Sequence, residues 1–316
     1  MKLSDIVNYK LSIKDTDTKS VQHEFYKFKK NLASTLDTHD VNFGDIKSQI
    51  HNDLQNISDL LENVENNLRL FEQKLNAFIH TYEPKYYEMG QSVYQDTVND
   101  SAEYIFERHT NQGLFDTEED TQFFLSRLSL YTDWRHPGMH IRPLSGALSD
   151  VLKALDPLYF VDTDPDLLQK VRQLWHPQYQ KRLRYYTINE QDDNPLKDLP
   201  QQQFGFVLVS EFFNYKSIEV VSKYLASVYS LLKPGGMLVF TFNNCDTVEG
   251  VRQVEAKFSP YTPARKIKKI AQKLGYKIEA EFSRPTKLSW LEVRKPGELT
   301  SMRNGQTLGS LKQLSR

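Results

Sequence analysis

The C-terminal half of the chain alternates short apolar runs with helical stretches, and this pattern restricts the fold more than any other feature. Five apolar runs follow one another from about Pro137. They are Met139–Pro143, Leu158–Asp162, Leu183–Asn189, Phe206–Ser210 and Met237–Asn243. Alternation of this kind is typical of parallel strands joined by crossover helices. The sequence therefore predicts a doubly wound α/β domain over residues 135–297.

Two further apolar runs, Tyr276–Phe282 and Leu288–Arg294, follow a helix expected over Pro263–Leu274. Only Ser283–Lys287 joins the two runs. A connection this short cannot be a crossover, so the two strands must pair antiparallel at one edge of the sheet. The expected domain is a mainly parallel, seven-stranded sheet with an antiparallel last strand.

A second regular pattern lies near the N-terminus, where nine apolar residues recur at alternating spacings of four and three. They are Ile50, Leu54, Ile57, Leu61, Val64, Leu68, Phe71, Leu75 and Phe78. This spacing is the seam of a coiled coil and predicts a helix over about 45–80, within a helical arm of residues 1–83. A similar stripe over Val21–Leu36 leaves two interpretations. Either the two stripes form a hairpin within the chain, or the Ile50–Phe78 helix binds another protein or a second copy.

Pro84 and Gly90 are expected to end the heptad helix. Separate helices over Ser92–Arg108 and Glu118–Asp133 would then form a helical cap, residues 84–134, on the α/β domain. Residues 298–316 form a basic C-terminal tail.

Composition excludes several classes of protein. The 316 residues carry a formal net charge of -1, whereas a chain that coats nucleic acid is usually basic, so nucleic acid is not an expected partner. A single cysteine, Cys245, rules out an intrachain disulfide framework. The chain has neither a signal-peptide pattern nor an apolar run of about 18 residues. We therefore expect no membrane contact and a cytoplasmic location.

Ligands of doubly wound sheets bind beyond the carboxyl ends of the strands. Asp162 ends the second strand, where a carboxylate accepts both hydroxyls of a ribose; the alternative is a solvated strand-end side chain. Asp164 has a structural role instead, because it is placed to cap a helix that starts at Pro165. After the first strand, Gly146 would let the backbone approach a ligand closely.

These segments resemble the class I S-adenosylmethionine-dependent methyltransferases. FGFVLVSEFFNY and LLKPGGMLVFTF resemble the fourth strand of that family and the turn into its fifth. LYFVDTDPDLL resembles the second strand, and SWLEVRKP the antiparallel seventh. The resemblance covers roughly Trp134–Pro296 and implies S-adenosylmethionine as the cofactor. The residues it implies as cofactor contacts are Arg142, Ser145, Gly146, Asp162, Asn189 and Glu190.

The chain departs from the family pattern after the first strand, where the family has an acidic residue and a G-x-G core. His140 stands at the acidic position, and Arg142 and Leu144 replace the paired glycines. Gly205 replaces an aspartate at the start of the fourth strand. Side chains at 142 and 144 are expected to crowd a backbone that must approach the cofactor, so the cofactor loop is predicted to be eroded.

Methyl transfer depends mostly on positioning of the acceptor, because the sulfonium is already activated. Ser210, Glu211 and Asn214 follow the fourth strand and are the candidate catalytic residues. Glu211 would accept a proton from the acceptor; the alternative is an acid that stabilises a helix N-terminus. His136 and His140 lack a third ligand at metal-site spacing, so no metal is expected.

Two functions are compatible with these features. One is a methyltransferase with an unidentified acceptor. The other is a catalytically inactive, methyltransferase-like assembly protein that docks through its arm. The combination of arm and domain also resembles proteins of tailed bacteriophages, which would place it in the host cytoplasm or the virion.

Overall fold

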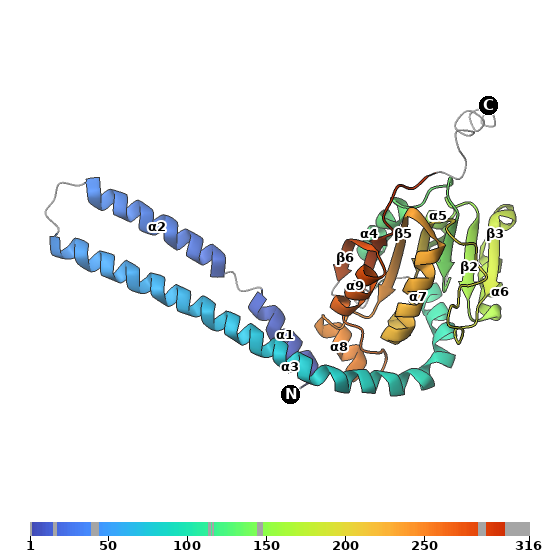
Figure 1. Ribbon diagram of the computed structural model, residues 1–316, viewed down its shortest axis with the longest axis horizontal. Coiled ribbons are helices and arrows are strands. Elements are labelled where there is room, and N and C mark those ends of the chain that lie inside the picture. Colours follow the sequence, from blue (N-terminus) through green and yellow to red (C-terminus); the bar gives the residue numbers. More distant parts are fainter. Residues whose placement is uncertain are drawn as a thin grey trace, which may run out of the picture. The chain divides into compact units, whose positions relative to one another are not determined.

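The computed structural model describes residues 2–14, 18–38, 44–112, 115, 117–143, 148–283 and 289–300. The chain divides into two compact units, Met1–Pro84 and Lys85–Arg316. The first unit is helical, and the second contains the sheet (Figure 1).

The sheet of the second unit has seven strands in the order β3-β2-β1-β4-β5-β7-β6. They are β1 (Gly138–Ile141), β2 (Leu158–Asp162), β3 (Leu183–Thr187), β4 (Phe204–Val209), β5 (Leu232–Phe242), β6 (Lys277–Ser283) and β7 (Ser289–Arg294). The first five strands pair parallel, and β7 runs antiparallel to both β5 and β6. The strand order reverses at β1. This is the Rossmann-like methyltransferase fold, which confirms the predicted fold class.

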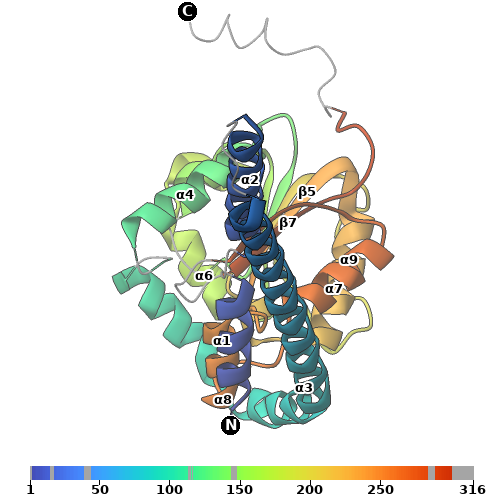
Figure 2. The same ribbon diagram turned by 90° about the vertical axis from the view of Figure 1, so that its left-hand side faces the viewer.

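Helices cover both faces of this sheet. They are α4 (Glu118–Ser129), α5 (Ser149–Leu152) and α6 (Pro165–Leu174) on one face, α7 (Ile218–Leu231) and α9 (Ala264–Lys273) on the other, and α8 (Val248–Glu255) after β5. Figure 2 shows α4 and α6 on the opposite side of the strands from α7 and α9. Along β4, Val207 and Val209 belong to the core under α7, whereas Phe206 and Leu208 belong to the core under α4. This alternation is what a sheet buried on both faces requires.

Side-chain caps mark where several of the helices that follow strands begin. Asp164 Oδ1 accepts the backbone N–H groups of Asp166 and Leu167, at 2.9 and 3.3 Å, and Pro165 is the first residue of α6. The predicted capping role of Asp164 is therefore confirmed. Ser217 caps α7 in the same way. Each such cap stabilises its helix by about 1 kcal/mol and fixes the loop that precedes it.

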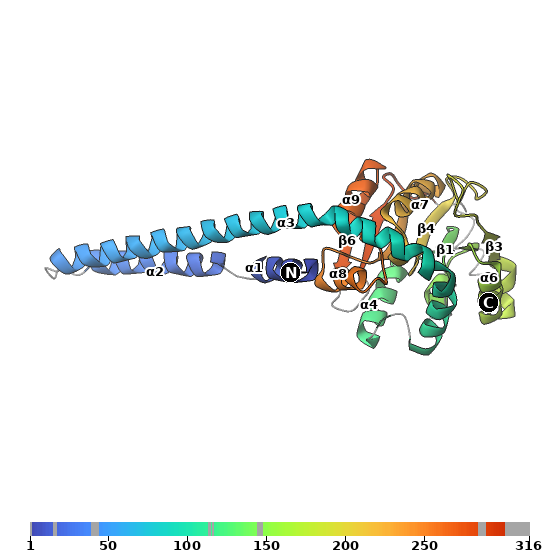
Figure 3. The ribbon, with the colours of Figure 1, turned by 90° about the horizontal axis from the view of Figure 1, so that it is seen from below.

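The first unit is built from α1 (Leu3–Lys14), α2 (Thr18–Thr38) and the first part of α3 (Gly44–Gln112). Figures 1 and 3 show α2 alongside α3. Gln22 Nε2 donates to Glu65 Oε2 at 2.8 Å, and Lys29 Nζ to Gln55 Oε1 at 3.3 Å. Later residues of α2 pair with earlier residues of α3, so the helices are antiparallel. The two stripes thus form the hairpin that was one of the two interpretations.

The prediction that Pro84 and Gly90 end the heptad helix is wrong. Helix α3 continues through both residues to Gln112, so Ser92–Arg108 is not a separate helix. An interior proline removes one backbone hydrogen bond and costs about 3 kcal/mol. Burial of apolar residues on either side, Ile79 and Tyr86, offsets this cost, and Pro84 itself is exposed. No helix in the described part of the chain is long and apolar enough to cross a membrane.

Candidate cofactor and acceptor site at the strand ends

Arg142 and Asp162, expected as separate cofactor contacts, contact each other. The Arg142 side chain places its Nε 3.0 Å from Asp162 Oδ2. The side chains are only 8% and 0% exposed. Arg142 has a φ of 59°, in the left-handed region that favours glycine. The first position of the expected G-x-G loop therefore has a conformation that favours glycine but carries an arginine. Leu144, Ser145 and Gly146 lie outside the described residues.

Asp162 also closes a turn, a role that the sequence interpretation did not give it. Its Oδ1 accepts the backbone N–H of Asp164 at 3.0 Å and the Thr163 hydroxyl at 3.4 Å. Its Oδ2 and the facing Arg142 Nε are both buried and are ion-paired, but neither atom forms a hydrogen bond. Burial raises the pKa of Asp162, although Arg142 and the backbone N–H groups oppose this shift. One buried carboxylate oxygen is therefore left without a hydrogen-bond donor.

A second ion pair lies beyond β3. Lys216 Nζ donates to Glu190 Oε2 at 2.6 Å, while Glu190 Oε1 is buried without a hydrogen bond. Burial lowers the pKa of Lys216, and Glu190 partly offsets this shift. Asn189, predicted beside Glu190, is exposed and uses its Oδ1 to accept the Gln191 N–H, so it closes a turn.

Phe212 lies within reach of both cations. The guanidinium carbon of Arg142 is 5.2 Å from the Phe212 ring centroid, and Lys216 Nζ is 4.7 Å from it. Cation–π contacts at these distances are attractive. We call Arg142, Asp162, Glu190, Phe212 and Lys216 the strand-end cluster. The two carboxylates balance the two cations. Neither Phe212 nor Lys216 was predicted from the sequence, although a single lysine that ends the aromatic stretch FFNYK was a possible signal.

The three candidate catalytic residues are all buried where β4 ends. Thr241 of β5, which sequence analysis missed, connects two of them. Its hydroxyl accepts the Glu211 N–H at 2.6 Å and donates to Asn214 Oδ1 at 2.9 Å. Ser210 Oγ lies 2.6 Å from His140 Nε2. Glu211 precedes a short 3₁₀ turn, Phe213–Tyr215, and so does not stabilise the first turn of α7.

His136 explains why Gly205 replaces the aspartate that the resemblance implies. A Cβ atom added at Gly205 would lie 2.5 Å from the His136 Cβ. The buried imidazole therefore takes the space of a side chain at position 205, and burial lowers the pKa of His136. His136 and His140 thus have packing and hydrogen-bonding roles. Within the described residues, no group of His, Cys, Asp and Glu side chains could hold a metal ion.

No family model and no curated protein sequence matches the chain. Solved structures do match it. The N-methyltransferase NodS from Bradyrhizobium japonicum, in complex with S-adenosylhomocysteine, is 16% identical; the match covers 62% of this chain and 97% of NodS, with a TM-score of 0.48. A chain from the complex of the Trm112 methyltransferase activator with a methyltransferase of Haloferax volcanii is 14% identical, over 64% and 99% of the two chains, with a TM-score of 0.49. An O-methyltransferase family protein from Burkholderia thailandensis is 14% identical over 57% of each chain, with a TM-score of 0.44.

These neighbours are similar to the chain in fold. The fold assignment itself rests on the strand order and the antiparallel β7. The comparisons give no support to the resemblance to tailed-bacteriophage proteins.

Proposed function

We propose that the α/β unit is a methyltransferase that binds S-adenosylmethionine at the strand-end cluster. The observation that carries this proposal is Asp162 Oδ2, a buried carboxylate oxygen at the end of β2 that is ion-paired with Arg142 Nε at 3.0 Å but accepts no hydrogen bond. Such an oxygen keeps the capacity to accept a hydrogen bond from a ligand. A ribose hydroxyl is a donor of the required kind, and the carboxyl end of β2 borders the point where the strand order reverses.

The residues of this site fit the nucleoside part of the cofactor. Asp162 would accept from the ribose. Glu190 Oε1, the second buried acceptor without a donor, would accept from the adenine amino group. The cofactor supplies a methyl group on an activated sulfonium. At the end of β4, Glu211 would accept a proton from the methyl acceptor, while the hydroxyl of Thr241 holds the Glu211 backbone and the Asn214 amide in place.

Calorimetric titration with S-adenosylmethionine and S-adenosylhomocysteine tests the proposal. Asp162→Asn keeps the shape of the side chain but removes its charge and half of its accepting capacity. We expect it to weaken binding by about 1.5–3 kcal/mol, or roughly tenfold to a hundredfold. Asp150→Asn is a matched control, because the Asp150 side chain is 87% exposed. Equal affinity of Asp162→Asn and the parent would remove Asp162 from the site. Absence of binding to the parent at millimolar cofactor would remove the methyltransferase proposal.

We also propose a docking role for the arm, on a different observation. One row of the heptad seam, Leu54 and Leu75, is only 6% exposed. The other row remains uncovered: Ile57, Val64 and Phe71 are 43%, 48% and 48% exposed. Such a row of large apolar side chains is typical of a helix that binds a further helix.

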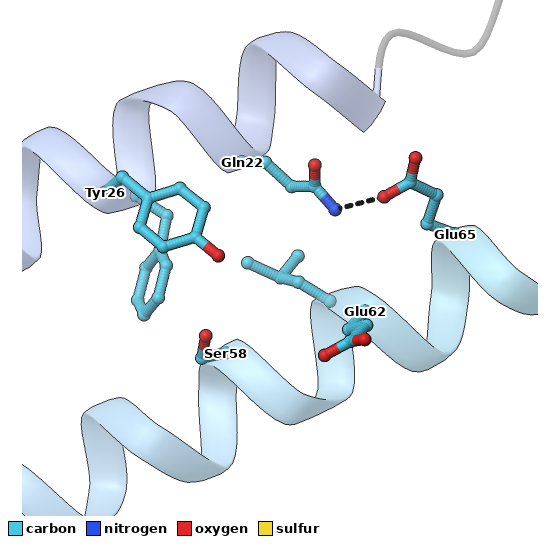
Figure 4. A pocket seen from close by; sticks show the side chains of 7 residues that line it. Gln22, Tyr26, Ser58, Glu62 and Glu65 are labelled. Atoms are coloured by element: carbon cyan, nitrogen blue, oxygen red, sulfur yellow. Dashed lines mark hydrogen bonds between the residues drawn. The ribbon is translucent and has the colours of Figure 1, made fainter.

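The packing between α2 and α3 is also incomplete. A pocket of about 290 Å³ separates them, and Figure 4 shows the Gln22–Glu65 hydrogen bond at one end and Tyr26 at the other. On α2, Val21 and Phe28 are 57% and 56% exposed and lie one heptad apart. Both helices therefore offer apolar rows of the same period, and the partner that matches this period is a second copy of the hairpin.

A further inference from the structure

We infer that α9 carries a binding surface for the phosphate backbone of a single-stranded nucleic acid. The surface is the basic face of α9, formed by Lys266, Lys269 and Lys273. This inference goes beyond the proposed function, because it concerns a different part of the α/β unit and requires no cofactor.

The overall net charge of -1 results from two parts of the chain with opposite charges. Residues 1–264 contain 27 Lys and Arg residues and 37 Asp and Glu residues, whereas residues 265–316 contain 13 and 4. The two parts therefore have formal charges of -10 and +9. The expectation that nucleic acid is not a partner used the overall charge, which does not describe the C-terminal part. Charge asymmetry of this kind is typical of chains that bind polyanions.

The acidic side chains of the C-terminal part do not neutralise the basic face. Three of the four form ion pairs elsewhere, which are Glu279–Arg294, Glu281–Lys268 and Glu292–Arg127. Lys269 and Lys273 are exposed, and within the described residues neither has a hydrogen-bond or ion-pair partner. The excess positive charge is therefore available to a ligand in solution.

The helix presents these lysines on one side. Spacings of three and four residues place Lys266, Lys269 and Lys273 on the same face of α9. The opposite face packs against the core of the sheet, where Ile267 and Ala271 are fully buried. The basic face is thus held in a fixed orientation by the burial of the apolar face.

The charges of α9 are unfavourable for an isolated helix. Its sequence, ARKIKKIAQK, contains no acidic residue, and its first turn contains Arg265 and Lys266. Cations at a helix N-terminus oppose the helix dipole, and like charges four residues apart, such as Lys269 and Lys273, repel each other. Asp246 pairs with Arg265 but not with the lysines of the basic face. A polyanion bound along α9 would reduce both unfavourable contributions.

Two observations favour a single-stranded nucleic acid over an anionic membrane. Burial of Ile267 and Ala271 leaves α9 without an apolar face that could enter a lipid layer. The connection that leads into α9 contains Lys257 and Phe258, both exposed, and Phe258 is 61% exposed. Exposed aromatic side chains next to cations stack with unpaired bases, so this pair suits a single strand.

Fluorescence anisotropy of a labelled single-stranded RNA of mixed sequence, titrated with the full chain, tests the inference. We expect a dissociation constant on the order of 1–100 μM at about 50 mM salt. Three phosphate contacts should make the logarithm of the binding constant fall with the logarithm of salt concentration with a slope of about -2. Unlabelled single-stranded DNA should compete, because the contacts are to phosphate.

The double variant Lys269→Gln, Lys273→Gln removes two of the three contacts. We expect it to bind about tenfold to a hundredfold more weakly, with a salt slope that is smaller by about 1.4. The control variant Lys153→Gln, Lys181→Gln makes the same charge change at two exposed lysines outside α9 and should bind like the parent. The melting temperature of the double variant should not fall, since the substitutions remove a repulsion.

Phe258→Ala separates stacking from charge. It should weaken binding of the single strand about fivefold or more and leave the salt slope unchanged, because it removes no cation. Affinity equal to that of the parent would overturn the assignment to a single strand.

Three other outcomes would overturn the inference as a whole. The first is a parent dissociation constant weaker than about 1 mM at low salt. The second is a lysine double variant with the affinity and salt slope of the parent. The third is tighter binding to phosphatidylserine vesicles or to polyglutamate than to RNA, which would assign the basic face to a membrane or to an acidic protein. None of these outcomes affects the nucleoside site, which calorimetry tests separately.

Discussion

Arg127 of α4 binds the fully buried carboxylate of Glu292 on β7: Arg127 Nε lies 3.0 Å from Oε1, and Nη2 lies 2.5 Å from Oε2. The Tyr131 hydroxyl and the Trp290 indole N–H also donate to this carboxylate, at 2.5 and 3.3 Å. Phe124 packs edge-on against Trp290, with ring centroids 5.0 Å apart. Helix α4, which precedes the sheet in the chain, is thus bound to β7, the last strand in the chain.

This contact predicts a pH-dependent stability. Burial alone would raise the pKa of Glu292, but the hydrogen bonds from Arg127, Tyr131 and Trp290 lower it below its ordinary value of 4.5. The carboxylate therefore stabilises the fold above pH 4.5, and its contribution is lost as the pH falls through the lower pKa of the folded state. We expect Glu292→Gln to destabilise the protein by about 3 kcal/mol at pH 7, and by progressively less at acid pH. Urea denaturation at several pH values measures the difference.

Glu279→Gln is the control, because Glu279 pairs with Arg294 at a partly exposed site and should contribute about 1 kcal/mol or less. A loss of stability in Glu292→Gln that does not change between pH 7 and acid pH would contradict the ionic role.

A side chain at position 205 should destabilise the α/β unit. In Gly205→Ala, the new Cβ would meet the His136 Cβ at 2.5 Å, a distance that requires one of the two backbones to shift. Overpacking of this kind typically costs about 1–3 kcal/mol. The double variant Gly205→Ala, His136→Gly should recover part of the loss, because glycine at 136 removes the Cβ that the new methyl group would meet. Thermal melting of the two single variants and the double variant measures this coupling. Additive losses would show that the two positions do not compete for space.

Cys245 should not react with thiol reagents in the folded protein. Its side chain is buried, and burial raises the pKa of the thiol to about 12, so almost no thiolate is present at pH 8. We expect an aromatic disulfide reagent to modify the thiol only after denaturation, with one equivalent released per chain. Rapid modification of the native protein at pH 8 would refute the burial of this thiol.

The sequence predicted the sheet well where local signals agree with tertiary packing. Strand β2 has the predicted limits, because the Asp164 cap and Pro165 mark where it ends. Strand β5 begins earlier than predicted. The Gly235 N–H donates to the Lys295 carbonyl at 2.9 Å, and the Lys295 N–H to the Gly236 carbonyl at 2.9 Å, which extends pairing into the KPGG turn. This pairing depends on a distant strand and leaves no local signal.

The site was predictable only in part, for the same reason. The strand-end position of Asp162 is visible in the sequence, because the fold places ligands there. Its partner is not, since the contact with Arg142 depends on a left-handed backbone at position 142 and on the spacing between β1 and β2. Thr241 is a single polar residue in an apolar run, and its role requires β4 and β5 to lie side by side.

We expect the isolated protein to associate with itself through the exposed row of α3, which consists of Ile57, Val64, Phe71 and Phe78. Phe71 is 48% exposed and lies one heptad from Val64, in the middle of that row. In the proposed assembly, Phe71→Asp would bury an unpaired carboxylate and should weaken association by several kcal/mol. The mass measured by light scattering should fall, while the α/β unit keeps its melting transition.

Two further variants identify the row that is involved. Asn63→Asp introduces the same charge at an exposed polar position of α3 and should leave the mass unchanged. Leu54→Asp changes a residue of the covered row, which is only 6% exposed, and should therefore unfold the hairpin itself and lower the helical circular dichroism. A parent protein that is monomeric at tens of micromolar would rule out self-association. The exposed row would then have to bind a different protein, because four large apolar side chains at heptad spacing, Ile57, Val64, Phe71 and Phe78, are rarely left in contact with water.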